Sequence, residues 1–325
     1  AVAIGGGVYP SPLSFIGQGF ESFRDATFDV GPTATGYSLV YRSLREEYSA
    51  PLLFPFLYGF RFPSYDRVNG ASVPFGPTIS LADGRFEADA IVTYRSNLGK
   101  LDPRLSASYQ AGRRSRLELE VQRGTFSNDT WIWSDYVNSL LTLGWGVDTR
   151  NYFRADRAEL RVYRLWEFSQ SQFEPFLGVR GEEAWPVGPT LGGNRAPWSA
   201  FRRGDSLGVL RPNPQFGRND VRSLLAGGRI EWESAGVKVL ASSVAERGIV
   251  DEQECVGLCV LDSFDFTQIT SDLTVGFPTF GEQEYQIDVH WVRSPGQEAP
   301  VQRFAYLGGQ GTLPFLNLLE QGGDE

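Results

Sequence analysis

The chain contains a single histidine, His290, which follows Asp288 by two residues. Residues two positions apart lie on the same face of a β-strand. In that arrangement the Asp288 carboxylate can orient the His290 imidazole as a general base near neutral pH. An Asp-x-His pair is a common combination, however, and no second acidic pair accompanies it. We therefore predict that the protein is not an enzyme, interpret His290 as a polar residue that lines a sheet, and keep catalysis by Asp288 and His290 as an alternative.

The two cysteines, Cys255 and Cys259, lie four positions apart in a polar segment, residues 251–262. In an exported protein this spacing predicts a small disulfide loop. A metal site would need more ligands, and the chain has only one histidine to offer. The glycine-rich segments at 227–228 and 308–311 precede no helical pattern and contain no lysine, so they are not nucleotide loops. The sequence predicts no metal and no cofactor.

Charged side chains recur at every second position of several short segments. Residues 85–95 alternate apolar and polar side chains, and residues 116–122 and 285–293 repeat the pattern. Because successive side chains of a strand point to opposite faces, each segment predicts a strand with one apolar and one charged face. In a barrel with lipid outside and water inside, the charged face lines the lumen. The residues predicted to line this lumen are Glu87, Asp89, Arg116, Glu118, Glu120, Arg229, Glu231 and Glu233.

The lengths of the strands and of their connections favour a membrane barrel. Most candidate strands are close to the roughly 9–11 residues that a tilted strand needs to cross a bilayer. Tight turns alternate with long connections at 127–156, 183–220 and 247–263, as in outer-membrane barrels. Residues 138–146 fit either a strand or a short helix within the first long connection. The candidate strands lie near residues 36–43, 54–62, 85–97, 103–111, 116–126, 157–168, 173–182, 221–233, 237–246, 264–277, 284–293 and 301–306.

These patterns predict an all-β fold, an antiparallel transmembrane β-barrel over residues 36–325 that follows an irregular segment over residues 1–35. Aromatic residues make up 14% of the chain, a surplus that aromatic girdles at the two membrane surfaces would explain. No stretch approaches the roughly 18 apolar residues of a membrane-spanning helix, which excludes a helical membrane protein.

Composition also bears on location and partners. The net charge of −9 argues against a nucleic acid partner. The chain contains no methionine, so we interpret it as a processed product whose export signal peptide has been removed. The expected location is the bacterial outer membrane. The expected partners are outer-membrane lipid or lipopolysaccharide and other envelope proteins.

The tail from Arg303 to Phe315 resembles the lid loop of the bacterial surface antigen family, the superfamily of outer-membrane assembly and secretion barrels. Members carry an aromatic residue, a Gly-Gly pair, Ser or Thr, Val or Leu, Arg, Gly and an aromatic residue. The matching positions are Tyr306, Gly308, Gly309, Thr312 and Leu313. Pro314 stands where the family has an arginine that inserts into the lumen. Segments 65–70, 138–140 and 148–152 are also similar to members of this group.

The resemblance implies a sixteen-stranded barrel, of which about 11–12 strands are visible in this chain, without the family's periplasmic domains and final strands. It implies a non-enzymatic role as a conduit or an assembly platform. Three alternatives stay open: a passive porin-like channel, a soluble secreted β-protein, and a protease. The protease alternative rests on Asp288 and His290, which are similar to the Asp–His pair of the omptin proteases.

Overall fold

The structure is a computed structural model that describes residues 2–6, 52–53, 59–82, 84–187, 198, 212–256, 258–279, 284–307 and 321–323. Within these residues the fold is all-β and antiparallel, with a few short helices. None of the helices in the described part of the chain is long and apolar enough to cross a membrane.

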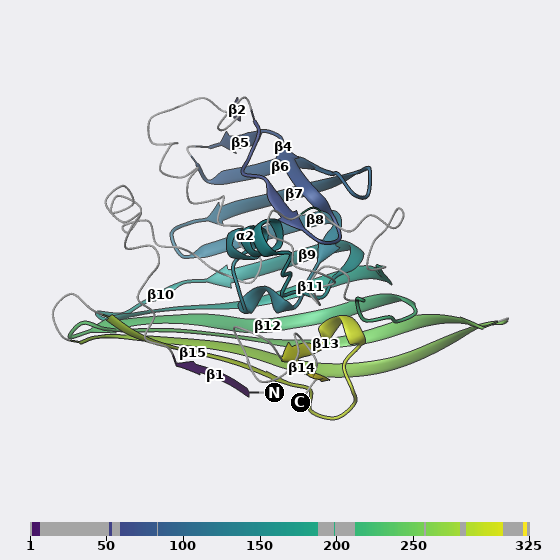
Figure 1. Cartoon of the computed structure of the whole chain (residues 1–325). Coiled ribbons are helices and arrows are strands. Elements are labelled where there is room, and N and C mark those ends of the chain that lie inside the picture. Colours follow the sequence, from purple (N-terminus) through teal and green to yellow (C-terminus); the bar gives the residue numbers. More distant parts are fainter. Residues whose placement is uncertain are drawn as a thin grey trace.

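One large sheet dominates the molecule (Figure 1). It contains fifteen strands, and most neighbours in the sheet are also neighbours in the sequence. The main path runs β1-β15-β14-β13-β12-β11-β9-β8-β7-β6-β4-β3, while β10 pairs with β11 and β5 pairs with β2 and β6. Its strands are β1 (Val2–Gly6), β2 (Leu52–Leu53), β3 (Ser64–Asp66), β4 (Gly70–Phe75), β5 (Thr78–Leu81), β6 (Phe86–Arg95), β7 (Lys100–Ala111), β8 (Ser115–Phe126), β9 (Phe153–Arg164), β10 (Trp166–Glu167), β11 (Ser171–Pro186), β12 (Arg218–Ser234), β13 (Val237–Val256), β14 (Leu258–Pro278) and β15 (Glu284–Arg293).

The predicted antiparallel sheet is confirmed, but its closure into a barrel is not. Among the described residues the main path of the sheet ends at β3 on one side and at β1 on the other, and no pairing joins those two ends. A second, two-stranded sheet pairs β16 (Ala305–Leu307) with β17 (Gln321–Gly323).

Local sequence explains the tight turns between strands. At the β12–β13 hairpin, Ala235 and Gly236 adopt φ values of 50° and 81°. Two successive residues with positive φ form the turn whose twist matches that of the flanking strands, and glycine adopts that conformation without strain. Gly112 (φ 78°) and Gly99 (φ 60°) serve the turns before β8 and β7. These turns fix the register of the long strands.

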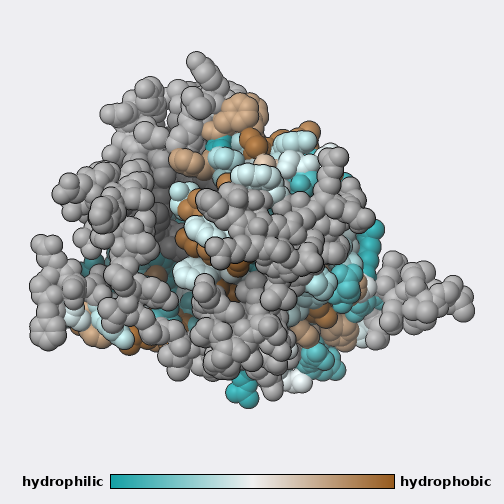
Figure 2. Space-filling model, in the orientation of Figure 1, coloured by the Kyte–Doolittle hydropathy of each residue, from teal (hydrophilic) through white to brown (hydrophobic). Residues whose placement is uncertain are grey.

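The faces of the sheet are inverted relative to a water-soluble protein. We call inward the face of the sheet that residues 127–152 and 294–304 cover, and outward the opposite face. Charged residues such as Glu159, Arg161, Glu182 and Glu246 lie on the inward face and are at most 6% exposed. The outward face is apolar and open. On the side of the molecule seen in Figure 2, hydrophobic and hydrophilic side chains are interspersed in the described part. Its exposed large residues are Val92, Tyr94, Leu101, Leu105, Tyr109, Leu117, Leu119, Val121, Leu160, Val162, Leu177, Val179, Leu224, Ile230, Trp232, Ile249 and Leu273.

Residues 127–152 leave the sheet between β8 and β9 and fold over its inward side; we call them the α2 excursion. They contain the short helix η3 (Asp129–Trp131) and the helix α2 (Asp135–Trp145), which lies in front of the sheet in Figure 1. The Ser134 side chain accepts a hydrogen bond from the Val137 amide, and Gly146 ends the helix in the left-handed conformation. The helical alternative for residues 138–146 is therefore confirmed.

Several strand boundaries differ from the predictions. Residues 2–6, inside the segment expected to be irregular, form β1 and pair with β15. The predicted long connection at 247–263 is wrong, because β13 and β14, of 20 and 21 residues, stay paired as far as Val256 and Leu258. The predicted strand at 301–306 begins instead with a short helix, η4 (Val301–Arg303). The candidate strand at 36–43 and most of the one at 54–62 lie outside the described residues.

The short strands β3, β4 and β5 were not predicted, because each contains too few residues for alternation to show. They extend the sheet beyond β6. The remaining strands from β6 to β15 overlap the predicted segments.

Gly248 tests how closely the inward face is packed. A Cβ atom at Gly248 would lie 2.5 Å from the Phe266 ring and 2.7 Å from the Ser223 hydroxyl, whereas one at Gly181 meets nothing within 4 Å. We expect Gly248→Val to lower the free energy of unfolding by about 1–3 kcal/mol through overpacking. Gly181→Val should leave it unchanged or raise it, since valine favours strands. Equilibrium denaturation measures both; equal effects would contradict the packing described here.

Candidate functional site

Opposite charges meet on the inward face of β9 and β11. The antiparallel register places Arg157 opposite Glu182 and Glu159 opposite Arg180. The Arg157 Nε atom lies 2.6 Å from Glu182, and the Arg180 Nε atom lies 2.6 Å from Glu159. Arg180 also reaches across β12 to Glu246 of β13, at 3.0 Å. The alternation of arginine and glutamate along each strand thus produces a row of ion pairs across the sheet.

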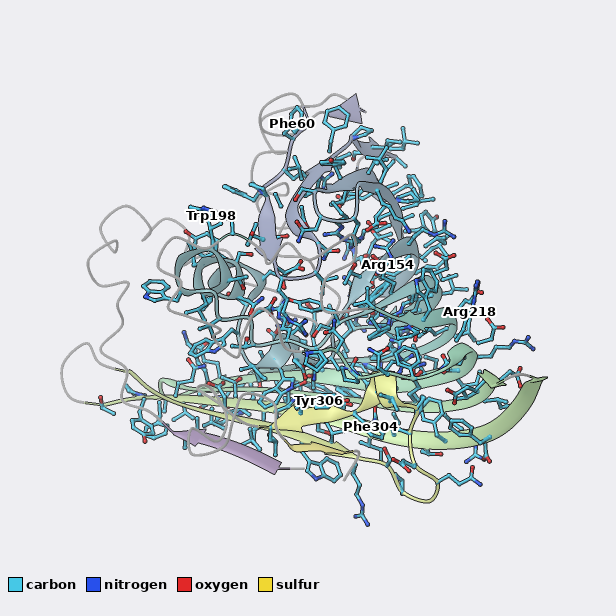
Figure 3. All side chains as sticks on the ribbon, turned by 45° about the vertical axis from the view of Figure 1, so that its right-hand side comes forward. Phe60, Arg154, Trp198, Arg218, Phe304 and Tyr306 are labelled. Carbon is cyan, nitrogen blue, oxygen red and sulfur yellow. The ribbon has the colours of Figure 1, made fainter. Side chains whose placement is uncertain are left out.

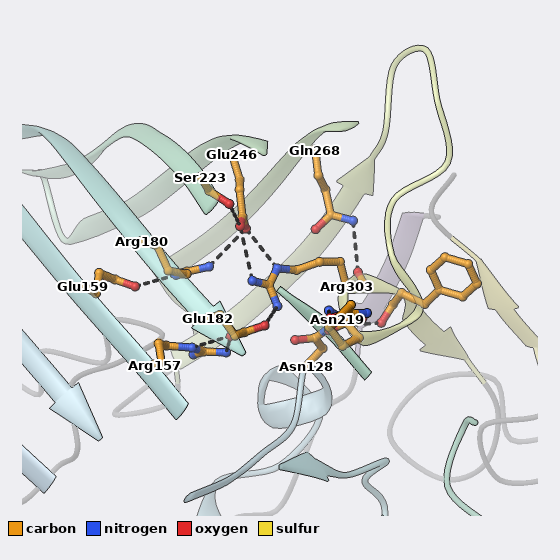
Figure 4. Close-up of polar contacts among 12 residues, drawn as sticks. Asn128, Arg157, Glu159, Arg180, Glu182, Asn219, Ser223, Glu246, Gln268 and Arg303 are labelled. Atoms are coloured by element: carbon orange, nitrogen blue, oxygen red, sulfur yellow. Dashed lines mark hydrogen bonds and ion pairs between the residues drawn. The ribbon is translucent and has the colours of Figure 1, made fainter. Parts of the chain in front are cut away.

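Arg303 completes this row from outside the sheet (Figure 4). Its guanidinium lies 2.9 Å from Glu182 and 3.1 Å from Glu246, and its side chain is only 5% exposed. Burial works against the charge of Arg303, but the two glutamates outweigh it and raise the pKa of the guanidinium. We call Arg157, Glu159, Arg180, Glu182, Glu246 and Arg303 the Arg303 cluster.

The backbone around Arg303 is held as firmly as its side chain. Residues 294–304, which we call the return segment, follow β15 and fold back over the inward face. Gln302 and Asn219 exchange amide hydrogen bonds, one of them 2.7 Å long. The Gln268 amide donates to the Arg303 carbonyl at 3.0 Å. Ala299 packs into an apolar cluster with Val221, Val250 and Phe266.

The α2 excursion is fixed by a second buried polar group, the Asp148 cluster, which comprises Arg67, Asn138, Asp148, Tyr152 and Asn213. The Arg67 amide donates to Asp148 at 2.9 Å, and the Arg67 guanidinium donates to the side chain of Asn213. Asn138 donates to Asp148 and to the Tyr152 hydroxyl. Burial, with a further contribution from the Asp148 carboxylate, raises the pKa of the Tyr152 hydroxyl well above its usual value, so this hydroxyl stays protonated and donates.

The Asp148 cluster brings together three segments that the family resemblance singled out: 65–70, 138–140 and 148–152. Arg67 and Asp148 are 81 residues apart in the sequence, so segment 65–70 contacts the other two segments only in the folded chain. The two covering segments also touch: Asn128 of the α2 excursion donates to the Gln302 carbonyl of the return segment. The cavity left where they meet is about 20 Å³, room for about one water molecule.

His290 lies on the inward face of β15, but its partner is not Asp288. Its Nδ1 atom lies 2.6 Å from Asp272 of β14, directly opposite in the register. The Trp131 ring of η3 stacks on the imidazole with centroids 4.4 Å apart and planes 9° from parallel. Asp288 instead accepts hydrogen bonds from Thr274 and Gln286. His290 and Asp288 thus share a face of β15, but the Asp288–His290 contact on which the protease alternative depends is absent from the described side-chain interactions.

The eight residues predicted to line the lumen all occupy inward positions of β6, β8 and β12, and most are engaged in ion pairs. Those pairs are Asp89 with Arg61, Arg116 with Glu118 and Glu174, Glu120 with Arg104, and Arg229 with Glu231. Figure 3 shows a further interior charge, Arg154, among packed side chains, and Arg218 at the margin. Arg154 binds Asp102 at 2.6 Å.

The remaining predicted sites are only partly described. Tyr306 lies in β16 opposite Gly322, while Gly308, Gly309, Thr312 and Leu313 lie outside the described residues. Cys255 and Cys259 face each other across the β13–β14 hairpin in the register. Directly opposite residues have Cα atoms about 4.5–5.5 Å apart, within the range that a disulfide spans. The disulfide itself stays a prediction.

Sequence reasoning missed Arg303, Asp272 and Trp131 as members of a site. The resemblance directed attention to the arginine position at Pro314, eleven residues after Arg303. The one sequence signal was that Arg303 opens the tail segment that carries the resemblance.

Comparison with known proteins assigns no family. No known protein family matches the sequence, and no curated protein is significantly similar to it. Among solved structures, a bacterial polysaccharide outer membrane secretin aligns with 68% of this chain and 80% of its own length, at 9% sequence identity and a TM-score of 0.25. A score this low does not establish a shared fold.

Removing Arg303 should release the return segment. In Arg303→Met, Glu182 and Glu246 stay buried without their shared cation, which should cost about 3–5 kcal/mol. Arg218→Met is the matched control, because it breaks an exposed ion pair with Glu183 and should cost about 0–1 kcal/mol. Hydrogen exchange of residues 294–304 and denaturation measure the two effects. Adding Glu246→Gln should recover part of the loss; equal costs for the two arginines would refute the role of the cluster.

Proposed function

We propose that this protein is a non-enzymatic outer-membrane protein whose outward sheet face contacts lipid and whose charged inward face forms a conduit closed by the return segment. The observation that carries the proposal is the inversion of the sheet: large apolar side chains are exposed, and paired charges are buried. A water-soluble sheet buries its apolar face instead. Exposed apolar area on this scale marks contact with a membrane or with another protein.

The exposed apolar residues of the outward face form a band across the strands, which we call the apolar band. Its height favours contact with a membrane over contact with a protein partner. On β11, the outward Glu183 follows the outward Phe173 by ten residues, and on β12 the outward Trp232 follows Arg222 by ten. Ten residues span about 33 Å along a strand, or about 25 Å along the normal of a bilayer at a tilt of about 40°. That is the height of the apolar band of outer-membrane strands.

Aromatic residues gather at the end of the band that carries the short turns. Trp166 and Phe173 pair with ring centroids 5.5 Å apart, and Phe277 and Tyr285 pair at 5.3 Å. Trp232 is exposed on the same side. Tyrosine and tryptophan favour the membrane surface, where one end of the ring is apolar and the other reaches water. The opposite, charged end of the band leads to the long connections, which lie outside the cell in outer-membrane barrels.

A closed conduit agrees better with the inward face than an open porin does. The Arg303 cluster holds the return segment, and the Asp148 cluster holds the α2 excursion, on the inward side of the sheet by buried hydrogen bonds and ion pairs. A protease at His290 is less well supported, since Trp131 stacks on the imidazole and Asp288 is engaged elsewhere.

A charge placed in the middle of the outward face tests the membrane assignment. Leu160 lies between the charged and aromatic ends of the band on β9 and is 38% exposed. We expect Leu160→Lys to destabilise the protein in lipid vesicles by about 2–4 kcal/mol, because lysine near the bilayer midplane is costly. Tyr136→Lys is the control, because Tyr136 is exposed on α2, away from the sheet. A protein that stays in solution without detergent and tolerates both changes equally would refute the proposal.

Conductance tests whether the return segment closes the conduit. In planar bilayers the unmodified protein should show little steady conductance. Arg303→Met should raise the open fraction, because the return segment then loses both ion pairs to the wall. Arg218→Met should behave like the unmodified protein. Steady conductance of the unmodified protein, unaltered in Arg303→Met, would show an open channel instead.

A further inference from the structure

The outward face contains a trough of about 890 Å³ at the charged end of its apolar band. It crosses six neighbouring strands, from β6 through β7, β8, β9 and β11 to β12. Adjacent strands are about 4.8 Å apart, so the trough is about 24 Å long. That length fits one extended hydrocarbon chain.

The residues along the trough explain why it is hollow and apolar. One cross-strand row contains residues that lie directly opposite one another in the register from β6 to β12. Its members are Ala90, Leu105, Val121, Ala158, Gly181 and Arg222. Alanine and glycine leave space between the larger neighbours, and a Cβ atom at Gly181 would meet nothing within 4 Å. The trough is therefore formed where small residues replace large ones, and it can accept a methylene chain without rearrangement.

A charged row borders the trough on the side of the long connections. Asp156 is paired with Arg123, and Glu183 is paired with Arg218. Arg222 differs from these arginines, because its side chain forms no ion pair or hydrogen bond with any residue in the described part of the chain. It lies at one end of the apolar row and is exposed. Asp220, two residues away on the same face, offers an acceptor beside it.

We propose that this trough binds one molecule of a phosphorylated glycolipid of the lipid A type, with one acyl chain in the trough and a phosphate on Arg222. The proposal rests on the proposed function, since it needs the outward face to meet lipid. An arginine that has no ion-pair or hydrogen-bond partner among the described residues, at the edge of the apolar band, suits a phosphate, which accepts the fork of guanidinium donors. Sugar hydroxyls can donate to Asp220, which an acyl chain bearing only a phosphate cannot do.

The test uses the full chain in detergent and native mass spectrometry with three probes: bis-phosphorylated lipid A, dephosphorylated lipid A, and phosphatidylglycerol. The unmodified protein should retain one lipid A molecule and prefer it to both other probes. Gly181→Leu fills the trough without backbone strain and should weaken lipid A binding about tenfold, or about 1.4 kcal/mol. Ala226→Leu is the matched control, since it adds the same side chain to the outward face outside the trough.

Arg222→Gln separates the headgroup from the chain. This variant should bind phosphorylated and dephosphorylated lipid A equally. Arg164 is an outward arginine at the aromatic end of the band, and Arg164→Gln should keep the preference. Binding by Gly181→Leu as tight as by Ala226→Leu would overturn the acyl site, and equal binding of phosphatidylglycerol would overturn the glycolipid assignment. Neither result depends on the Leu160→Lys comparison in vesicles, so the trough can fail while the membrane assignment stands.

Discussion

Charge pairing across the inward face is the constraint on which the rest of this structure depends. Side chains alternate strictly between faces, so a slip of one residue in any strand would move its arginines and glutamates to the open apolar face. The observed register keeps these charges on the inward face, where Arg157 pairs with Glu182 and Glu159 pairs with Arg180. Each of these four charges thereby finds an opposite charge on the next strand. Pairing of charges therefore selects the register that the tight turns also favour, and the two requirements agree.

The same constraint explains what covers the inward face. A segment without Arg303 at this place would leave Glu182 and Glu246 buried without the cation that they share, a cost of several kcal/mol. The covering segments instead bring polar groups: Arg303 and Gln302 from the return segment, and Asn128 from the α2 excursion. Their binding is specific because each donor must meet a particular acceptor. Such a closure holds firmly when all partners are present and weakens sharply when one is removed.

Long strands with strict alternation could be predicted from the sequence, and β15 at Glu284–Arg293 matches its predicted range. The inward position of the charged residues was also predictable, because it depends only on the period of two. The distal part of β13 and β14 was not, since residues 251–254 are polar at four successive positions and show no alternation. Asp272 and Arg303 were missed for a different reason. Their partners lie 18 to 121 residues away in the chain, and no local pattern reports such contacts.

The length of the β13–β14 hairpin has a consequence for reach. Arg247 marks the charged end of the outward band on β13, and the strand continues for nine more residues to Val256. At about 3.3 Å per residue this distal part extends about 30 Å, which is about the diameter of a small domain. The predicted Cys255–Cys259 disulfide would join its two strands near the tip and make this distal part of the hairpin stiff. In the proposed outer-membrane orientation, a molecule that approaches the cell would meet the tip of this hairpin well before it meets the lipid surface.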